Sequence, residues 1–164
     1  MCQFLSAIVS RTGDVYCNPL IDSHEDIIDY FNIRDNTMQN IVRVEFRPDD
    51  KKDYINVEKY NLVVDEPTTP EWFAEYKDNV LEHLTRIIKN ITITEDKKIL
   101  CGGAFIIGDN IKVGKLIGCD IKYAGSSTIE YAGSSTIEYA GSSTIKDAGY
   151  STIENAKYKN GKKL

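Results

Sequence analysis

One octapeptide repeats near the C-terminal end of this chain, and it limits what the chain can fold into. An Ala-Gly pair and an isoleucine each recur every eight residues, and the isoleucines are Ile129, Ile137, Ile145 and Ile153. A short fixed period is typical of stacked units that bury a core together. A glycine and a β-branched run in every unit argue against a helix. An aliphatic residue at the same place in every unit argues against a flexible linker.

The repeats predict a β-solenoid over residues 98–155, in which each octapeptide supplies one strand and one glycine corner and points Ile and Ala inward. The register continues upstream in weaker form through Ile121, Val113 and Phe105. If two octapeptides make one coil, residues sixteen apart stack on each other. Stacking predicts three favourable pairs and one like-charged pair: Glu130 with Lys146, Lys122 with Glu138, Tyr123 with Tyr139, and Glu138 with Glu154.

Residues 1–97 have the pattern of an α+β domain. Residues 4–9 and 15–17 predict a hairpin around Gly13, and residues 41–47 and 60–64 predict two further strands. Ser23, followed by His24, Glu25 and Asp26, predicts the capped start of a short helix. A second helix is predicted from Thr69 to about residue 88, with an apolar stripe formed by Phe73, Tyr76, Val80, Leu84 and Ile87.

Composition and charge narrow the range of functions. Residues 1–99 carry 12 Lys and Arg against 19 Asp and Glu, a net charge of −7, and residues 100–164 carry 8 against 6, a net charge of +2. The acidic first part argues against nucleic-acid binding, which needs clustered cations. The lysines of residues 156–164 predict a flexible, solubilising tail. No apolar run is long enough for a membrane span, so we expect no membrane partner and a cytoplasmic protein.

The cysteines predict reduced thiols and no bound metal. Cys2, Cys17, Cys101 and Cys119 are scattered without a CxxC spacing, and the chain has only two histidines. We expect no cofactor. Cys2 supports one catalytic hypothesis: if Met1 is removed, its thiol and the new α-amino group form the nucleophile and base of an N-terminal amidohydrolase.

The chain resembles a family of small proteins encoded in bacteriophage and prophage genomes. The resemblance rests on Met1-Cys2 followed by Phe4, the run from Asp22 to Ile28, Pro70-Glu71-Trp72-Phe73, and octapeptides of the Gly-Ser-x-Thr-Ile type. It covers almost the whole chain and implies an origin in phage. The family supplies no catalytic residues to carry over.

The most regular surface that the repeats predict is a set of hydroxyl and aromatic rows. It comprises Tyr123, Thr128, Tyr131, Thr136, Tyr139, Thr144 and Thr152. Such rows could bind a flat partner or form the solvated side of the solenoid. The first hypothesis is a non-enzymatic phage accessory protein that binds a host or phage protein in the bacterial cytoplasm, with the solenoid as a rigid assembly module that can form homo-oligomers. The alternatives are the Cys2 amidohydrolase and ice binding by the threonine rows.

Overall fold

The computed structural model describes residues 4–37, 39–154, 158–159 and 162–163. The chain forms two compact units. The first contains the residues up to 49 together with residues 57–89, and the second contains residues 50–56 together with the chain from residue 90 onward. The N-terminal region holds a sheet and two α-helices, and a β-solenoid of about four turns occupies residues 92–153. The predicted β-solenoid is therefore confirmed as a fold, and it begins at residue 92 rather than at residue 98.

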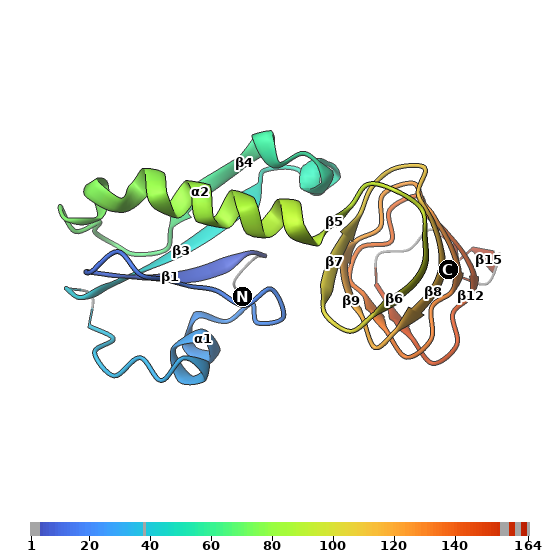
Figure 1. Ribbon diagram of the computed structural model, residues 1–164, viewed down its shortest axis with the longest axis horizontal. Helices are drawn as coiled ribbons and strands as arrows, with labels where there is room; N and C mark the ends of the chain where they lie inside the picture. The colour runs from blue at the N-terminus through green and yellow to red at the C-terminus, as the bar shows by residue number, and fades with distance from the viewer. Residues whose placement is uncertain (1–3, 38, 155–157, 160–161, 164) are drawn as a thin grey trace. The chain divides into compact units, whose positions relative to one another are not determined.

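The first unit is built on an antiparallel four-stranded sheet with the order β2-β1-β3-β4. Its strands are β1 (Ser6–Ser10), β2 (Val15–Tyr16), β3 (Ile41–Pro48) and β4 (Tyr60–Val64). These are the four strands that the sequence predicts, and β1 and β2 form the predicted hairpin. Figure 1 shows α2 (Phe73–Ile91) along one face of this sheet and α1 (His24–Tyr30) on the other face.

The short helix α1 begins where its capping residues predict. The Ser23 Oγ accepts a hydrogen bond from the backbone N–H of Asp26 at 3.2 Å. His24 lies at the helix start, but its ring is buried and its Nε2 is 3.0 Å from the carbonyl oxygen of Val44. The histidine therefore ties α1 to β3, a role that the capping pattern does not reveal.

The long helix α2 begins later than predicted, at Phe73 rather than after Thr69. The preceding residues form a tighter turn, in which the N–H groups of Phe73 and Ala74 donate to carbonyls three residues earlier. The buried stripe is Phe73, Val80, Leu84 and Ile88. The stripe ends on Ile88 rather than Ile87. Residues seven and four positions apart lie on the same face of a helix, and Val80, Leu84 and Ile88 continue that spacing from Phe73.

The second unit contains two parallel sheets whose strands alternate along the chain. One sheet has the order β12-β10-β8-β6, and the other has the order β13-β11-β9-β7-β5. Their strands are β5 (Thr92–Ile93), β6 (Lys97–Cys101), β7 (Ala104–Ile107), β8 (Lys112–Ile117), β9 (Asp120–Tyr123), β10 (Thr128–Tyr131), β11 (Thr136–Ile137), β12 (Thr144–Asp147) and β13 (Thr152–Ile153). Paired residues such as Ile129 and Ile145 are sixteen apart, which confirms two octapeptides per coil.

The solenoid interior is filled as the repeat predicts. The residues at the isoleucine and alanine positions of the described coils are buried, apart from Phe105 and Ile153, which are half-buried. The hydroxyl groups of buried serines accept hydrogen bonds from backbone N–H groups of the neighbouring coil. The N–H of Ser127 donates to the Oγ of Ser143, and the N–H of Ser135 donates to the Oγ of Ser151. Cys119 takes the serine position in an earlier coil, where its N–H donates to Ser135 Oγ. The core is therefore apolar at its centre and hydrogen-bonded near its corners.

A segment from earlier in the chain completes the second unit. This segment contains the 3₁₀ turn η1 (Lys51–Ile55), which follows β3 and packs beside β7 and β9. The next 3₁₀ turn, η2 (Val57–Lys59), belongs to the first unit. The tail predicted for residues 156–164 lies partly outside the described residues. Within this tail the structure describes two short strands, β14 (Tyr158–Lys159) and β15 (Lys162–Lys163), which pair in antiparallel fashion.

Candidate binding surfaces

The structure divides the predicted threonine row between two sheets. Thr128 and Thr144 are paired neighbours on β10 and β12, whereas Thr136 and Thr152 are paired neighbours on β11 and β13. The division follows from the sixteen-residue coil, because consecutive octapeptides lie in different sheets. Each sheet therefore displays a row of two threonines, with Thr128 half-buried and the other three exposed.

The predicted tyrosines divide in the same way. The rings of Tyr123 and Tyr139 stack with their centroids 5.3 Å apart and their planes 10° apart, as the sixteen-residue stacking predicts. Tyr131 lies in the other sheet, where the Lys115 Nζ is 5.3 Å from its ring centroid. Tyr123 and Tyr139 thus form one aromatic pair, and Tyr131 belongs to a separate surface.

The segment η1 adds residues to the aromatic pair that the repeats do not predict. The Tyr54 ring lies 5.9 Å from that of Tyr123, and the Lys51 Nζ is 5.7 Å from the Tyr139 ring centroid. Beside them is a pocket of about 330 Å³ whose lining includes Tyr123, Tyr139, Lys52, Asp109, Ser126 and Ser142. Burial, followed by the charge of Asp109, raises the pKa of Tyr123 above its usual range. Tyr123 therefore remains a neutral hydroxyl at physiological pH.

Ion pairs between coils hold the outward side chains of both sheets. Lys122 Nζ is 2.6 Å from Glu138 Oε1 and 3.0 Å from Asp120 Oδ2, and its side chain is only 2% exposed. In the other sheet, Glu130 lies between Lys112 and Lys146, at 3.2 and 3.1 Å. Hydrogen bonds from Lys146 and Lys112 lower the pKa of Glu130. Two of the predicted charge pairs, Glu130 with Lys146 and Lys122 with Glu138, are confirmed.

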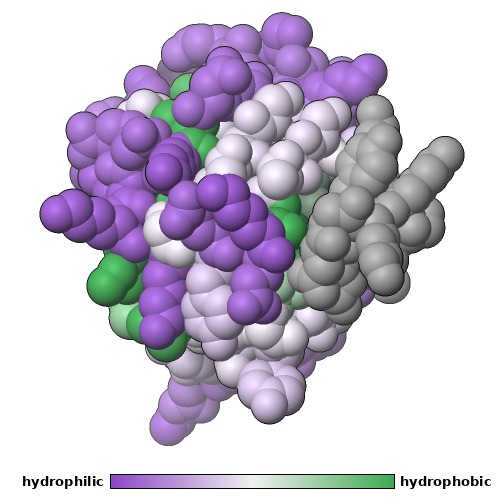
Figure 2. Space-filling model, turned by 90° about the vertical axis from the view of Figure 1, so that its right-hand side faces the viewer, coloured by the Kyte–Doolittle hydropathy of each residue, from purple (hydrophilic) through white to green (hydrophobic). Residues whose placement is uncertain are grey.

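Figure 2 shows one face of the molecule, on which hydrophilic and neutral residues dominate and hydrophobic residues appear as small separate areas. This agrees with a solenoid whose isoleucines and alanines are buried, whereas three of its four repeat threonines and the first serine of three octapeptides, such as Ser126, are exposed. An outer surface of this composition offers hydrogen bonds and ion pairs to a partner rather than a broad apolar contact.

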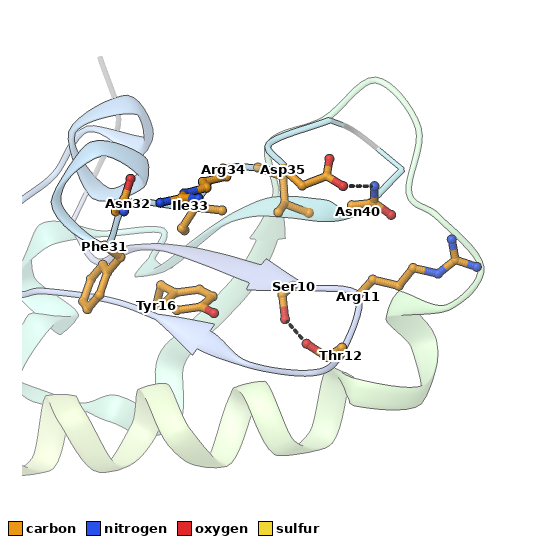
Figure 3. A pocket seen from close by; sticks show the side chains of 11 residues that line it. Ser10, Arg11, Thr12, Tyr16, Phe31, Asn32, Ile33, Arg34, Asp35 and Asn40 are labelled. Carbon is orange, nitrogen blue, oxygen red and sulfur yellow. Dashed lines mark hydrogen bonds between the residues drawn. The ribbon is translucent and has the colours of Figure 1, made fainter.

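The first unit carries a groove of about 630 Å³ between the β1–β2 turn and the chain that leaves α1. Its lining includes the apolar or aromatic residues Tyr16, Phe31 and Ile33 and the two arginines Arg11 and Arg34. Figure 3 shows Tyr16 and Phe31 at one end of the groove and Ser10 and Thr12 toward the other end. The Tyr16 and Phe31 rings contact each other with centroids 5.4 Å apart. This is an aromatic surface that a partner can reach.

Hydrogen bonds hold both walls of the groove. Asn40 Nδ2 donates to Asp35 Oδ2 at 2.8 Å, and this bond is the main cause of a lowered Asp35 pKa. On the opposite wall Thr12 Oγ1 donates to Asp14 Oδ2 at 2.6 Å, and its oxygen is 2.8 Å from Ser10 Oγ. Walls held in this way need little ordering when a ligand binds, which favours binding.

Neither the groove nor the pocket was predicted from the sequence. The sequence does contain one signal for the groove, the consecutive aromatic residues Tyr30 and Phe31 at the end of α1. Neighbouring residues on a helix point in different directions, so these two rings cannot both be buried in the same core. Tyr30 is 63% exposed and Phe31 37% exposed. No local signal identifies the η1 residues, because their neighbours in space lie about seventy residues later in the chain.

The candidate nucleophile Cys2 lies outside the described residues. Burial raises the pKa of Cys17 to about 12, and burial also raises the pKa of Cys119. These two thiols are therefore poor nucleophiles. Cys101 is exposed on the first coil. Within the described ranges, no cluster of three or more His, Cys, Asp or Glu side chains could hold a metal ion.

No protein-family model, curated protein or solved structure matches this chain. None of the helices that the structure describes is long and apolar enough to cross a membrane.

Proposed function

We propose that this chain is a non-enzymatic phage accessory protein that binds a host or phage protein in the bacterial cytoplasm. In this proposal the α+β unit recognises the partner, and the solenoid is a rigid module for assembly or interaction. The resemblance to small phage and prophage proteins is the reason for proposing an origin in phage. The function itself rests on how the solenoid holds its outward side chains.

The observation that carries the proposal is the sixteen-residue register of the solenoid. It places like positions directly over one another, so that Lys122 meets Glu138 and Tyr123 stacks on Tyr139. Side chains held by such contacts lose little conformational freedom when a partner docks. A regular and rigid surface therefore favours a role in binding over a role in catalysis, which needs a reactive group with a perturbed pKa in a cleft.

The groove of the first unit supports the same proposal. Its lining joins the aromatic side chains of Tyr16 and Phe31 to the guanidinium groups of Arg11 and Arg34, and within the part of the chain that the structure describes neither arginine makes an ion pair. Tyr, Phe and Arg are enriched in protein interfaces. The groove is thus the natural recognition site of this unit.

Affinity capture with the full chain as bait tests the proposal. The variant pairs are Thr136→Lys with Thr152→Lys in one sheet, Thr128→Lys with Thr144→Lys in the other, and Phe31→Ala with Arg34→Ala in the groove. Each pair serves as the control for the other two, and circular dichroism verifies that each variant folds. We expect one protein to be retained from host or phage-infected lysate at near-stoichiometric amounts, and one variant pair to abolish its retention.

Two results would contradict the proposal. Failure to retain any protein in stoichiometric amounts would leave the chain without the partner that it requires. Equal retention by all three variant pairs would mean that neither the solenoid rows nor the groove forms the binding surface.

A further inference from the structure

We infer that the pocket beside Tyr123 and Tyr139 is a binding site for a neutral sugar, a small ligand with several hydroxyl groups and no charge. The pocket has a volume of about 330 Å³, at the small end of the range for ligand sites. It lies within the second unit, where η1 supplies Lys52 and a solenoid corner supplies Gly125 and Gly141. The site is distinct from the protein-binding groove proposed above and adds a second kind of ligand.

The Tyr123 hydroxyl is the clearest sign of a ligand. Tyr123 is only 6% exposed, yet its hydroxyl makes no hydrogen bond to any residue that the structure describes. Its oxygen is not fully enclosed, and the residue lines the pocket. A nearly buried hydroxyl without a protein partner needs one from water or from a ligand. Because Tyr123 stays neutral, this hydroxyl can both donate and accept a hydrogen bond.

Further polar groups with unused hydrogen-bonding capacity line the same pocket. Within the described part of the chain, the hydroxyls of Tyr139, Ser126 and Ser142 make no hydrogen bond. Asp109 Oδ1 accepts a hydrogen bond from the backbone N–H of Ser126 at 2.9 Å, which holds the carboxylate in place, and Oδ2 has no partner among the described residues. Because positions sixteen apart stack on each other, the repeat gathers these groups in one pocket instead of spreading them along the solenoid.

The charges around the pocket favour a neutral ligand over an ionic one. Burial is the main cause of the raised Tyr123 pKa, and three carboxylates add to it, those of Asp109, Asp50 and Asp53. Two lysines of η1 offset these carboxylates: Lys51 Nζ is 5.7 Å from the Tyr139 ring centroid, and Lys52 lines the pocket. An anion or a cation therefore gains little here, whereas a sugar hydroxyl can accept from a lysine and donate to a carboxylate. The two tyrosine rings add an apolar wall for the C–H groups of the sugar ring.

Nuclear magnetic resonance titration of the isotope-labelled full chain tests this site. The neutral probes are glucose, galactose, mannose, N-acetylglucosamine and maltose, and the charged probes are inorganic phosphate and spermidine. We expect at least one neutral sugar to shift the amide signals of Ser126 and Ser142 in a saturable way and to leave that of Ser134 unchanged. Ser134 is the matched control, because it has the same place in the octapeptide but does not line the pocket.

Three variants connect the binding to the named groups. Asp109→Asn keeps an acceptor for the Ser126 N–H but removes the charge, and we expect it to weaken sugar binding about tenfold. Ser142→Ala should weaken binding severalfold, and Ser134→Ala should leave it unchanged. Thermal unfolding verifies that the variants fold.

Three results would overturn the inference. The first is that no neutral sugar shifts the amides of Ser126 and Ser142. The second is that phosphate or spermidine binds at these amides more tightly than every sugar. The third is sugar binding that neither Asp109→Asn nor Ser142→Ala weakens more than Ser134→Ala does.

Discussion

At the scale of single residues, the glycines of the solenoid corners combine two requirements. Gly141 has a φ of +54°, a conformation that is costly for residues with a side chain. A Cβ at Gly141 would also lie 2.5 Å from the carbonyl oxygen of Gly125 in the coil below. Gly118 shares the positive φ of +59° but has open space where its Cβ would be. A side chain at Gly118 would therefore cause backbone strain alone, whereas a side chain at Gly141 would cause both backbone strain and a clash with the neighbouring coil.

We expect Gly118→Ala to lower the free energy of unfolding by about 1–2 kcal/mol, from backbone strain alone. Gly141→Ala should lower it by about 3 kcal/mol or more, because the neighbouring coil must also move. Urea denaturation followed by far-UV circular dichroism measures both values. Equal losses at the two positions would show that the coils are not packed as closely as the structure has them.

At the scale of the strands, equivalent ion pairs occur in buried and exposed settings. Lys122 with Glu138 and Lys146 with Glu130 both join residues sixteen apart in neighbouring coils. The Lys122 side chain is 2% exposed, whereas that of Lys146 is 58% exposed. Water and salt screen exposed pairs strongly and buried pairs weakly. Burial, rather than spacing, therefore decides what each pair contributes.

Two double-mutant cycles measure this difference. For Lys122→Met with Glu138→Gln we expect a coupling energy of about 1–3 kcal/mol, because the Lys122 charge is buried and its attraction to Glu138 is screened only weakly. For Lys146→Met with Glu130→Gln, the matched exposed pair, we expect a coupling within experimental error. Chemical denaturation supplies the four stabilities of each cycle. A coupling of the same size in both cycles would contradict the buried environment of Lys122.

At the scale of the whole molecule, the solenoid repeats every sixteen residues although its sequence repeats every eight. Removing residues 131–146 deletes one full coil and brings Glu154 to the place of Glu138, where it still faces Lys122. Removing residues 131–138 deletes only half a coil. It brings Lys146 opposite Lys122 and Glu154 opposite Glu130, so that both charge ladders contain like charges.

The shorter deletion should therefore be the more damaging one. We expect the chain lacking residues 131–146 to unfold cooperatively at a melting temperature moderately below that of the full chain. The chain lacking residues 131–138 should melt at a clearly lower temperature, although it keeps eight more residues. Thermal unfolding followed by circular dichroism decides the order. A melting temperature that falls with the number of residues removed would argue against the sixteen-residue coil.

Local patterns predicted the elements of this fold because their causes are local. Ser23 caps α1 through a bond to a residue three positions away, and β4 begins and ends where its apolar run does. The predicted start of α2 was wrong. Thr69 and Pro70 have the pattern of a helix start, but the residues after them form a tight turn, and the α-helix begins only at Phe73. The burial of His24 was missed for a different reason. It depends on Val44, which is twenty residues away.

The sequence by itself determined the solenoid and, on the assumption of two octapeptides per coil, the stacking of Tyr123 on Tyr139, whereas the sixteen-residue coil itself was established by the strand register. It could do so because a strict repeat turns long-range contacts into a fixed spacing that can be counted. Only the tertiary structure decided that the threonine and tyrosine rows lie on two sheets rather than one surface, that η1 packs beside Tyr123, and that Tyr16 and Phe31 meet in a groove. These contacts join segments that no repeat relates, so their geometry depends on how whole elements pack.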